Sequence, residues 1–225
     1  MANYVKNRLG IYAPSKERLK EILDSIKSKE LEDGTIHPLD FNSIDPTPKD
    51  LHENFSLTEE KAARYLVRDI LEPVPKKWAI EDWNSMTEEQ REISLPGARR
   101  MIENVLTHGH ATWFDWAIAH WGTKWNAISP EMEEDNVICF QTAWSEPKEL
   151  LKTLSKKFPD TSFKNTYADE NCGYNCGVVR YMNGKEYRHK PEKGSVSAYE
   201  LSFSLWPEKE KLFTLTEDGY EPIEE

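Results

Sequence analysis

Residues 137–167, VICFQTAWSEPKELLKTLSKKFPDTSFKNTY, decide the fold, because a strand, a helix and a second strand follow one another in them. The β-branched and aromatic residues at the start are typical of a strand over 136–144. Pro147 then stands in the first turn of a helix over 147–158, in which apolar residues recur at helical spacing: Leu150, Leu151, Leu154 and Phe158. A short turn leads into a strand over 161–168.

Strands and helices alternate towards both ends of the chain as well. A strand over 4–13 precedes an amphipathic helix over 15–28. On the other side we expect a strand over 176–182, which an Asn-Gly pair turns into a hairpin with residues 186–188, and a last strand over 199–206. Short strands with two amphipathic helices indicate an α+β fold, in which an antiparallel sheet carries its helices on one face.

The middle of the chain is predicted to be helical, after a long polar connection. Residues 29–55 hold several prolines and are typical of a connection with turns. Helices are expected over 58–71, around 87–92, and from Pro96 at a first turn through Leu106. This block is richer in charged residues and helix formers than the segments on either side of it.

These elements predict a single domain of 225 residues. Its sheet-forming core comprises about residues 1–28 and 107–206, and a helical insertion occupies about 56–106. An acidic C-terminal tail follows over about 207–225.

The composition limits the classes of function. The chain has 29 Lys and Arg against 40 Asp and Glu, and the resulting net charge of −11 argues against direct binding to nucleic acid. No long apolar run occurs and no apolar segment follows Met1, so we expect a cytoplasmic protein without a membrane helix or secretory signal. Three cysteines cannot all pair, which fits a reducing compartment. The acidic tail is expected to be solvated; mimicry of a nucleic-acid backbone is the alternative.

Two segments carry a resemblance to a known family. Residues 113–127 read WFDWAIAHWGTKWNA and residues 140–147 read FQTAWSEP. With the opening MANYVKNR, they resemble the YubB and Api-like proteins of phages and conjugative plasmids. The resemblance covers roughly residues 1–28 and 107–182. It implies a ferredoxin-like domain carried by mobile elements, and it implies no enzymatic activity.

The segment WGTKWNA, residues 121–127, is the first candidate binding site. Trp121, Lys124, Trp125 and Asn126 combine two indoles, an ammonium group and an amide, which can hold a flat or anionic ligand by stacking and charge-assisted hydrogen bonds. The alternative is structural. In that interpretation the two indoles anchor a helix to the sheet, Asn126 caps the chain and Lys124 is solvated.

Four potential metal ligands lie close together in the sequence: His108, His110, Asp115 and His120. A metal hydrolase needs three or four such groups around an open coordination position. No H-E-x-x-H spacing occurs, and Asp115 is expected to begin a helix with Thr112. We therefore expect no metal and no other cofactor, and a metal-dependent hydrolase using His108, His110 and His120 stays as an alternative.

The remaining candidates have structural interpretations. Cys172 and Cys176, in CGYNC, are expected to be ordinary thiols, as is Cys139 in its apolar strand; a reversible disulfide between the first two is the alternative. The acidic residues 133–135 are expected in a solvated loop. Trp144 is expected in the core, because apolar residues occupy both alternate sets of positions in its strand.

No sequence motif of a catalytic site is present, so we predict no catalytic residue and favour a protein that is not an enzyme. The leading hypothesis is a mobile-element accessory protein, a binding module that acts on a host protein and does not enter a membrane. The alternatives are the metal-dependent hydrolase and a protein that binds or mimics nucleic acid.

Overall fold

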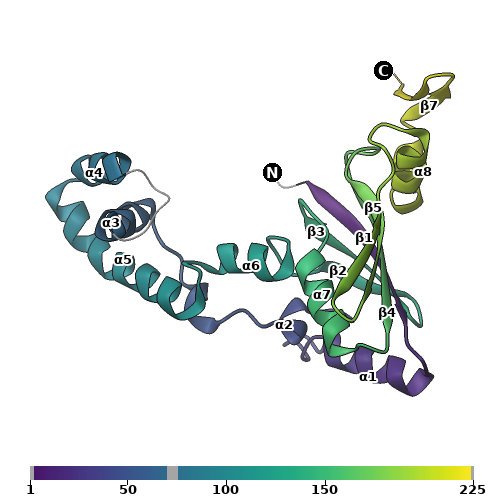
Figure 1. The fold of residues 1–225 in the computed structure, drawn as a ribbon, viewed down its shortest axis with the longest axis horizontal. Helices are drawn as coiled ribbons and strands as arrows, with labels where there is room; N and C mark the ends of the chain where they lie inside the picture. The colour runs from purple at the N-terminus through teal and green to yellow at the C-terminus, as the bar shows by residue number, and fades with distance from the viewer. Residues whose placement is uncertain (1–2, 70–75, 224–225) are drawn as a thin grey trace. The chain divides into compact units, whose positions relative to one another are not determined.

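The computed structural model describes residues 3–69 and 76–223, and its contacts divide the chain into two units. The larger unit comprises Met1–Pro46 and Ala117–Glu225, and the smaller comprises Thr47–Trp116. Figure 1 labels most of their helices and strands. Within the described ranges, no helix has the length and apolar character needed to cross a membrane.

The larger unit is built on a six-stranded sheet. The strand order is β2-β3-β1-β4-β5-β6, and every neighbouring pair is antiparallel. In chain order its elements are β1 (Tyr4–Tyr12), α1 (Lys16–Ile26), α2 (Phe41–Ile44), β2 (Ile128–Glu134), β3 (Val137–Ala143), α7 (Lys148–Lys157), β4 (Ser162–Asp169), β5 (Cys176–Met182), β6 (Lys185–His189), α8 (Val196–Leu205), α9 (Pro207–Glu210), β7 (Phe213–Thr216) and β8 (Gly219–Pro222). The α+β class and the antiparallel sheet predicted from the sequence are confirmed.

Four strands and two helices of this unit follow the ferredoxin-like order. Along the chain the order is β1, α1, β2, β3, α7 and β4, and in the sheet β1 lies between β3 and β4 with β2 at one edge. The hairpin of β5 and β6 extends the sheet beyond β4 and turns at Asn183-Gly184, as expected. The strands expected as β1, β3, β4 and β5 and the helices expected as α1 and α7 are all present.

One face of the sheet is covered by helices and holds the main core. Alternate residues of a strand point to opposite faces, and Leu9 of β1 with Phe163 and Tyr167 of β4 point to this one, where each is buried. The helix α7 packs on β4, β5 and β6. The helix α1 joins α7 there, because the guanidinium of Arg18 lies 4.9 Å from the ring centroid of Phe158. We call this side the covered face.

The helix α8 corrects the expectation of a strand over 199–206. The Ser195 side chain caps its first turn. Tyr199, Phe203 and Trp206 recur at spacings of four and three, which forms a helical stripe that an alternating interpretation overlooks. The stripe packs on the second face of the sheet, where the Trp206 indole donates to a backbone carbonyl of β4 at 2.9 Å.

The helix α8 covers only one end of the second face. It contacts the sheet near Ala168 and Cys176, which are buried beneath it. Further along the same strands the side chains are partly or fully exposed. We call this uncovered part the open face; it comprises Gly10, Tyr12, Lys164, Arg180 and Tyr187.

The strand β2 replaces the loop that was expected around residues 133–135. Glu133 and Glu134 belong to this strand, and both pair with Arg8 of β1, Glu134 at 3.1 Å. Sequence reasoning missed β2 because it is an edge strand that contains Pro130 and several charged residues. Both features are typical of edges and neither resembles an apolar strand.

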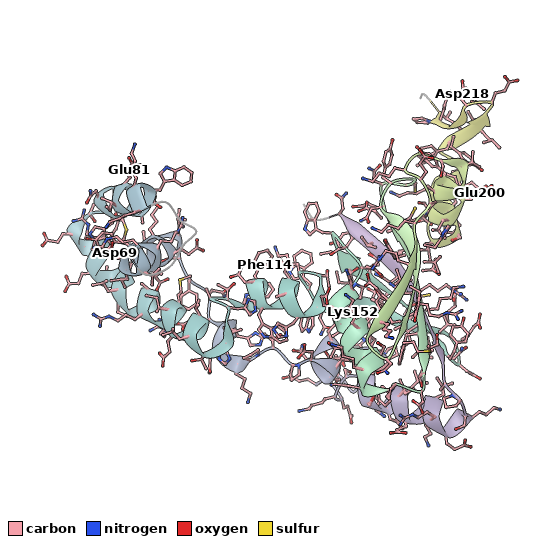
Figure 2. All side chains as sticks on the ribbon, in the orientation of Figure 1. Asp69, Glu81, Phe114, Lys152, Glu200 and Asp218 are labelled. Carbon is pink, nitrogen blue, oxygen red and sulfur yellow. The ribbon has the colours of Figure 1, made fainter. Side chains whose placement is uncertain are left out.

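Residues 207–223 contain a short helix and a hairpin where an acidic tail was expected. Phe213 of β7 lies 5.2 Å from Tyr199 between ring centroids, and Tyr220 of β8 lies 5.1 Å from Phe203. These aromatic contacts dock the hairpin on α8. Acidic residues of this segment, such as Asp218 at the turn, remain exposed (Figure 2).

Trp144 contradicts the expectation of a core position. It follows the last residue of β3, and 54% of its surface is exposed. Its φ is +69°, in the left-handed region that non-glycine residues rarely adopt. This conformation turns the indole out of the alternation of β3. The apolar pattern of the strand therefore could not predict where the side chain points.

The smaller unit is helical. Its elements are η1 (Lys49–His52), α3 (Leu57–Val67), α4 (Lys76–Asn84) and α5 (Glu88–His108), and α6 (Trp113–Trp121) begins in this unit and ends in the larger one. Capping boxes begin both α3 and α5. The helix α3 ends at Val67, before the expected end at Leu71, and Leu71 itself lies outside the described residues.

The helix α5 is one continuous helix where two were expected. Pro96 lies inside it, although a proline in a helix interior costs about 3 kcal/mol. Buried small residues of α5 pack against α3, with Ala98 in contact with the cluster formed by Ala62 and Ala63, and this packing offsets the cost. The helix α4 was not expected, and it docks on α3 through Tyr65 and Trp83, whose stacked rings are 4.5 Å apart.

Candidate functional site

Trp121, the first residue of the WGTKWNA segment, is 4% exposed. Its indole nitrogen donates to the Asp45 carbonyl at 2.9 Å, and its ring meets Phe41 edge-on at 5.5 Å. Phe41 in turn meets Phe140 of β3 at 6.0 Å. The indole therefore links α2 to the core of the covered face.

Asn126 is occupied by internal hydrogen bonds. Its side-chain oxygen accepts from the backbone nitrogens of Phe41 and Ala127, both at 2.8 Å, and its amide donates to Asp40 at 2.7 Å. Lys124 and Trp125 are both half-buried, with the ammonium 4.9 Å from the ring centroid. The geometry of Trp121 and Asn126 thus follows the structural interpretation, and a ligand-binding role of the segment stays a prediction.

The histidine cluster is divided between the two units. His108 lies 3.4 Å from Asp50 in the smaller unit, and His120 lies 3.1 Å from Asp45 in the larger one. Asp115 bonds Thr112 at the start of α6, as expected for a helix-start pair. In residues 3–69 and 76–223, no three His, Cys, Asp or Glu side chains are grouped as metal ligands would be.

The three cysteines are free thiols. Cys172 and Cys176 are buried in the cluster beneath α8, and Cys139 is half-buried in β3. Burial raises the pKa of all three thiols above the usual value. A thiol with a raised pKa is a poor nucleophile at neutral pH, so these residues are suited to packing.

Sequence reasoning missed a polar network that begins at Glu146. This residue precedes Pro147 at the start of α7 and is 6% exposed. Its carboxylate forms an ion pair with Arg188 of β6, accepts from the Tyr181 hydroxyl at 3.1 Å and lies 3.4 Å from the Asn165 amide. Four elements therefore meet at one buried carboxylate.

Burial and the Glu146 charge keep the tyrosine hydroxyls of this network protonated, and the same charge keeps its arginine protonated. Burial raises the pKa of Tyr167 to about 12, and the Glu146 charge acts in the same direction. Burial and then Glu146 likewise hold the pKa of Tyr181 well above its usual range. Burial opposes the charge on Arg188, but the adjacent Glu146 outweighs it, so the pKa of Arg188 is raised. General acid–base catalysis needs a group that ionises near the working pH, and these tyrosine and arginine side chains do not.

The network opens to solvent through a cavity of about 350 Å³, which we call the Glu146 pocket. Besides Glu146, Tyr167 and Arg188 it is lined by Ile118, Gly122, Ser145, Lys148, Glu149, Asn175 and Lys190. Of its basic residues, Lys148 lies 3.4 Å from Glu186, whereas Lys190 is exposed. The Lys152 side chain, labelled on α7 in Figure 2, reaches the same Glu186 at 3.3 Å.

Gly122 joins the two segments that carry the family resemblance. Its φ is +82°, and a Cβ at this position would lie 3.0 Å from the Lys148 backbone nitrogen. Only glycine fits both conditions. The Ser145 hydroxyl donates to the Gly122 carbonyl at 2.5 Å. The WGTKWNA and TAWSEP segments therefore meet at one wall of the Glu146 pocket.

Trp144 stands next to the pocket and is held by its backbone. Its nitrogen donates to the Asn3 carbonyl at 2.9 Å, and its carbonyl accepts from the Asn175 amide at 3.2 Å. Asn175 itself lines the pocket. The exposed indole therefore projects from a fixed loop. An acidic residue directly before a proline at a helix start was the sequence signal for Glu146, but nothing in the sequence identifies Arg188 as its partner.

A protein-family model supports the fold of this region. Residues 120–206 match the family model described as the ferredoxin-like domain in Api92-like protein, a range that contains Trp144, Glu146 and Arg188. Among solved structures, the protein api92 from Yersinia pseudotuberculosis is similar with a TM-score of 0.37 and 13% identity, over 85% of this chain and 99% of that chain. A search of curated proteins gives no match. The expected ferredoxin-like domain is thus confirmed.

Proposed function

We propose that this protein is a non-catalytic binding module, an accessory protein of a phage or plasmid that captures a host protein at Trp144 and the Glu146 pocket. The observation that carries the proposal is the exposed indole of Trp144 in a left-handed conformation. Such a conformation costs about 1–3 kcal/mol and is concentrated at functional sites. A large apolar ring exposed to water at that cost indicates selection for a contact with a partner.

The physical properties of Trp144 suit an interface anchor. Tryptophan, tyrosine and arginine dominate the residues whose truncation weakens protein complexes most. The hydrogen bond that Trp144 donates to Asn3 and the one that it accepts from Asn175 fix the backbone of this residue, which lowers the entropy lost on binding. The proposed partner therefore presents an apolar hollow for the indole.

The pocket beside Trp144 supplies the polar rim of this proposed interface. Lys190 is exposed at its edge, and Ser145 and Asn175 offer hydrogen-bonding groups nearby. Rim charges steer association and select partners more than they add affinity. An acidic group on the partner, close to the hollow that receives the indole, would complement Lys190.

The proposed origin in a mobile element rests on the sequence resemblance of residues 113–127 and 140–147 to the Api-like proteins of phages and plasmids. We propose that the protein acts in the host cytoplasm. The genomic position of the gene tests the origin directly. A gene inside a prophage or on a conjugative plasmid supports it, and an isolated chromosomal gene flanked by housekeeping genes contradicts it.

The binding role is tested with the full-length protein, Trp144→Ala, and Trp78→Ala as a matched control. Trp78 lies on α4 and is 62% exposed, so its removal deletes an indole of similar exposure elsewhere. A host protein captured by the parent and by Trp78→Ala is then purified and titrated calorimetrically. We expect Trp144→Ala to weaken its binding by about 30-fold or more, the effect of a hot-spot residue. Equal affinity of all three proteins would refute the proposed site.

A further inference from the structure

The open face carries a row of four residues across four adjacent strands. Gly10 of β1 pairs with Lys164 of β4, Lys164 pairs with Arg180 of β5, and Arg180 pairs with Tyr187 of β6. Residues paired across antiparallel strands point to the same face. The row therefore places two cations side by side and a tyrosine, 57% exposed, at one end.

A second tyrosine completes the other end of the row. A Cβ built on Gly10 would lie 3.0 Å from both the Cε2 and the hydroxyl of Tyr12, so the Tyr12 ring lies over Gly10. Half of Tyr12 is nevertheless exposed. The resulting order across the sheet is ring, cation, cation, ring. With strands about 4.8 Å apart, the row spans roughly 14 Å.

The two central cations have no acidic partner among residues 3–69 and 76–223. Other cations on the same face do: Arg8 pairs with Glu133 and Glu134, and Lys6 pairs with Glu208. Like charges directly opposite each other in a sheet are destabilising. A chain with 40 acidic residues has many candidates to neutralise Lys164 and Arg180, yet within the described part of the chain both cations stay uncompensated. Their charge complements an anion from outside the protein.

A shallow groove runs beside these cations. Its volume is about 480 Å³, and it is lined by Ser162, Lys164, Val178, Arg180, Met182, Tyr187 and His189. Val178 and Met182 give it an apolar floor on which a flat ring can rest. The groove thus combines positive charge with an apolar, aromatic surface.

We propose that the open face binds single-stranded nucleic acid, with backbone phosphates at Lys164 and Arg180 and bases stacked on Tyr12 and Tyr187. Single strands offer phosphates and unstacked bases together, and sheet faces that bind them combine cations with aromatic platforms. A duplex keeps its bases stacked inside and leaves the rings unused. An acidic peptide would contact the two cations and would not need the two tyrosine rings.

The net charge of −11 limits the affinity of this binding and determines how it depends on salt. The overall field repels polyanions, so the affinity is modest and is strongest at low salt. Two phosphate contacts predict a slope of log K against log salt of about −1.4 for a single strand. The local phosphate contacts and the overall negative field of the protein therefore make separate contributions to the affinity, and each contribution can be measured.

This inference is independent of the proposed host-protein interface. Lys164 points to the open face, whereas its neighbours Phe163 and Asn165 point to the covered face, where Asn165 contacts Glu146. Variants of the open face leave Trp144 untouched. Failure of one proposal therefore does not imply failure of the other.

The test is fluorescence anisotropy of the full-length protein with labelled single strands of DNA and RNA, about 12 nucleotides long. Lys164→Gln/Arg180→Gln is compared with Lys29→Gln/Lys193→Gln, a control that removes the same charge from exposed lysines elsewhere. We expect the first variant to weaken binding by about tenfold or more and to abolish most of the salt slope. The control should retain the affinity within about twofold and should keep the salt slope.

The role of the rings is measured with Tyr12→Ala/Tyr187→Ala and Tyr12→Phe/Tyr187→Phe. The alanine variant should lose about fivefold or more in affinity while keeping the salt slope, and the phenylalanine variant should bind like the parent, because stacking needs the ring and not the hydroxyl. A labelled duplex and a polyglutamate peptide complete the comparison. Absence of binding at low salt, equal loss in the lysine control, or preference for the duplex or the peptide would each overturn the proposal.

Discussion

Two cation sites on opposite faces of the sheet differ in how their charge is compensated. On the covered face, Arg188 is paired with buried Glu146 and donates to the Tyr167 hydroxyl at 3.3 Å. On the open face, Lys164 and Arg180 stand opposite each other. The first arrangement supports the fold, because the buried charges are paired and hydrogen-bonded. The second works against it, since adjacent like charges repel. The charge of Arg188 on the covered face therefore maintains the fold, whereas the charges of Lys164 and Arg180 on the open face are available to a ligand.

The largest expected effect is a difference in stability between alanine substitutions of two tryptophans. Trp121→Ala removes a buried ring that packs on the covered face, and it should lower the free energy of unfolding by about 3–5 kcal/mol. Trp144→Ala removes an exposed ring and should change it by no more than about 0.5 kcal/mol. Urea denaturation of both variants measures the contrast. Similar losses in the two would place Trp144 in the core after all.

The next effect tests the buried ion pair. Glu146→Gln removes the buried counter-charge of the Arg188 guanidinium, although the half-buried Glu186 carboxylate stays 3.6 Å away, and should destabilise the protein by about 3 kcal/mol. Glu149→Gln, on the first turn of α7 and only three residues away, is the matched control and should have a small effect. Equal urea midpoints for the parent and Glu146→Gln would show that the pair does not support the fold.

A smaller effect is expected at Asn126. Asn126→Ala removes the acceptor for two backbone N–H groups and should cost about 1–3 kcal/mol. Lys124→Ala, two residues earlier, should stay within about 0.5 kcal/mol. Thermal melts of the two variants provide the measurement. Unchanged melting of Asn126→Ala would contradict the structural role seen in the hydrogen bonds.

The pH dependence of stability gives a further test of the covered face. The pKa of Tyr167 rises from 10.0 to about 12 on folding, so the folded state holds this proton more tightly than the unfolded state. The resulting stability is fully present below pH 10, declines as pH rises further and is lost above about 12. Urea midpoints across this range should fall less steeply for Tyr167→Phe than for the parent. Identical slopes would show that Tyr167 is not the titrating group.

Local signals made much of the fold predictable from the sequence. β1, β3, β4 and β5 show clear strand patterns, Ser15 begins α1, and the Asn-Gly pair marks a hairpin, because each depends on a few neighbouring residues. β2 and α8 were missed for different reasons. The edge strand lacks an apolar pattern, and the stripe of α8 also fits a strand when only a few residues are considered.

The candidate sites depend on contacts that are distant in the sequence. Glu146 and Arg188 are 42 residues apart, and the row on the open face draws on four strands. Only the sheet register brings Lys164 beside Arg180. The exposure of Trp144 depends on one backbone dihedral, which the apolar pattern around it conceals. Pairing and register thus determine the sites, and sequence periodicity does not reveal them.

The most direct test of the contrast between the two faces is the free energy of unfolding of Lys164→Gln/Arg180→Gln, measured by urea denaturation. Removal of two opposed like charges should leave stability unchanged or raise it by about 0.2–1 kcal/mol, because the pair opposes the fold and its charge serves a ligand. A loss of about 1 kcal/mol or more would contradict the account, since it would mean that these cations stabilise the sheet as Arg188 does.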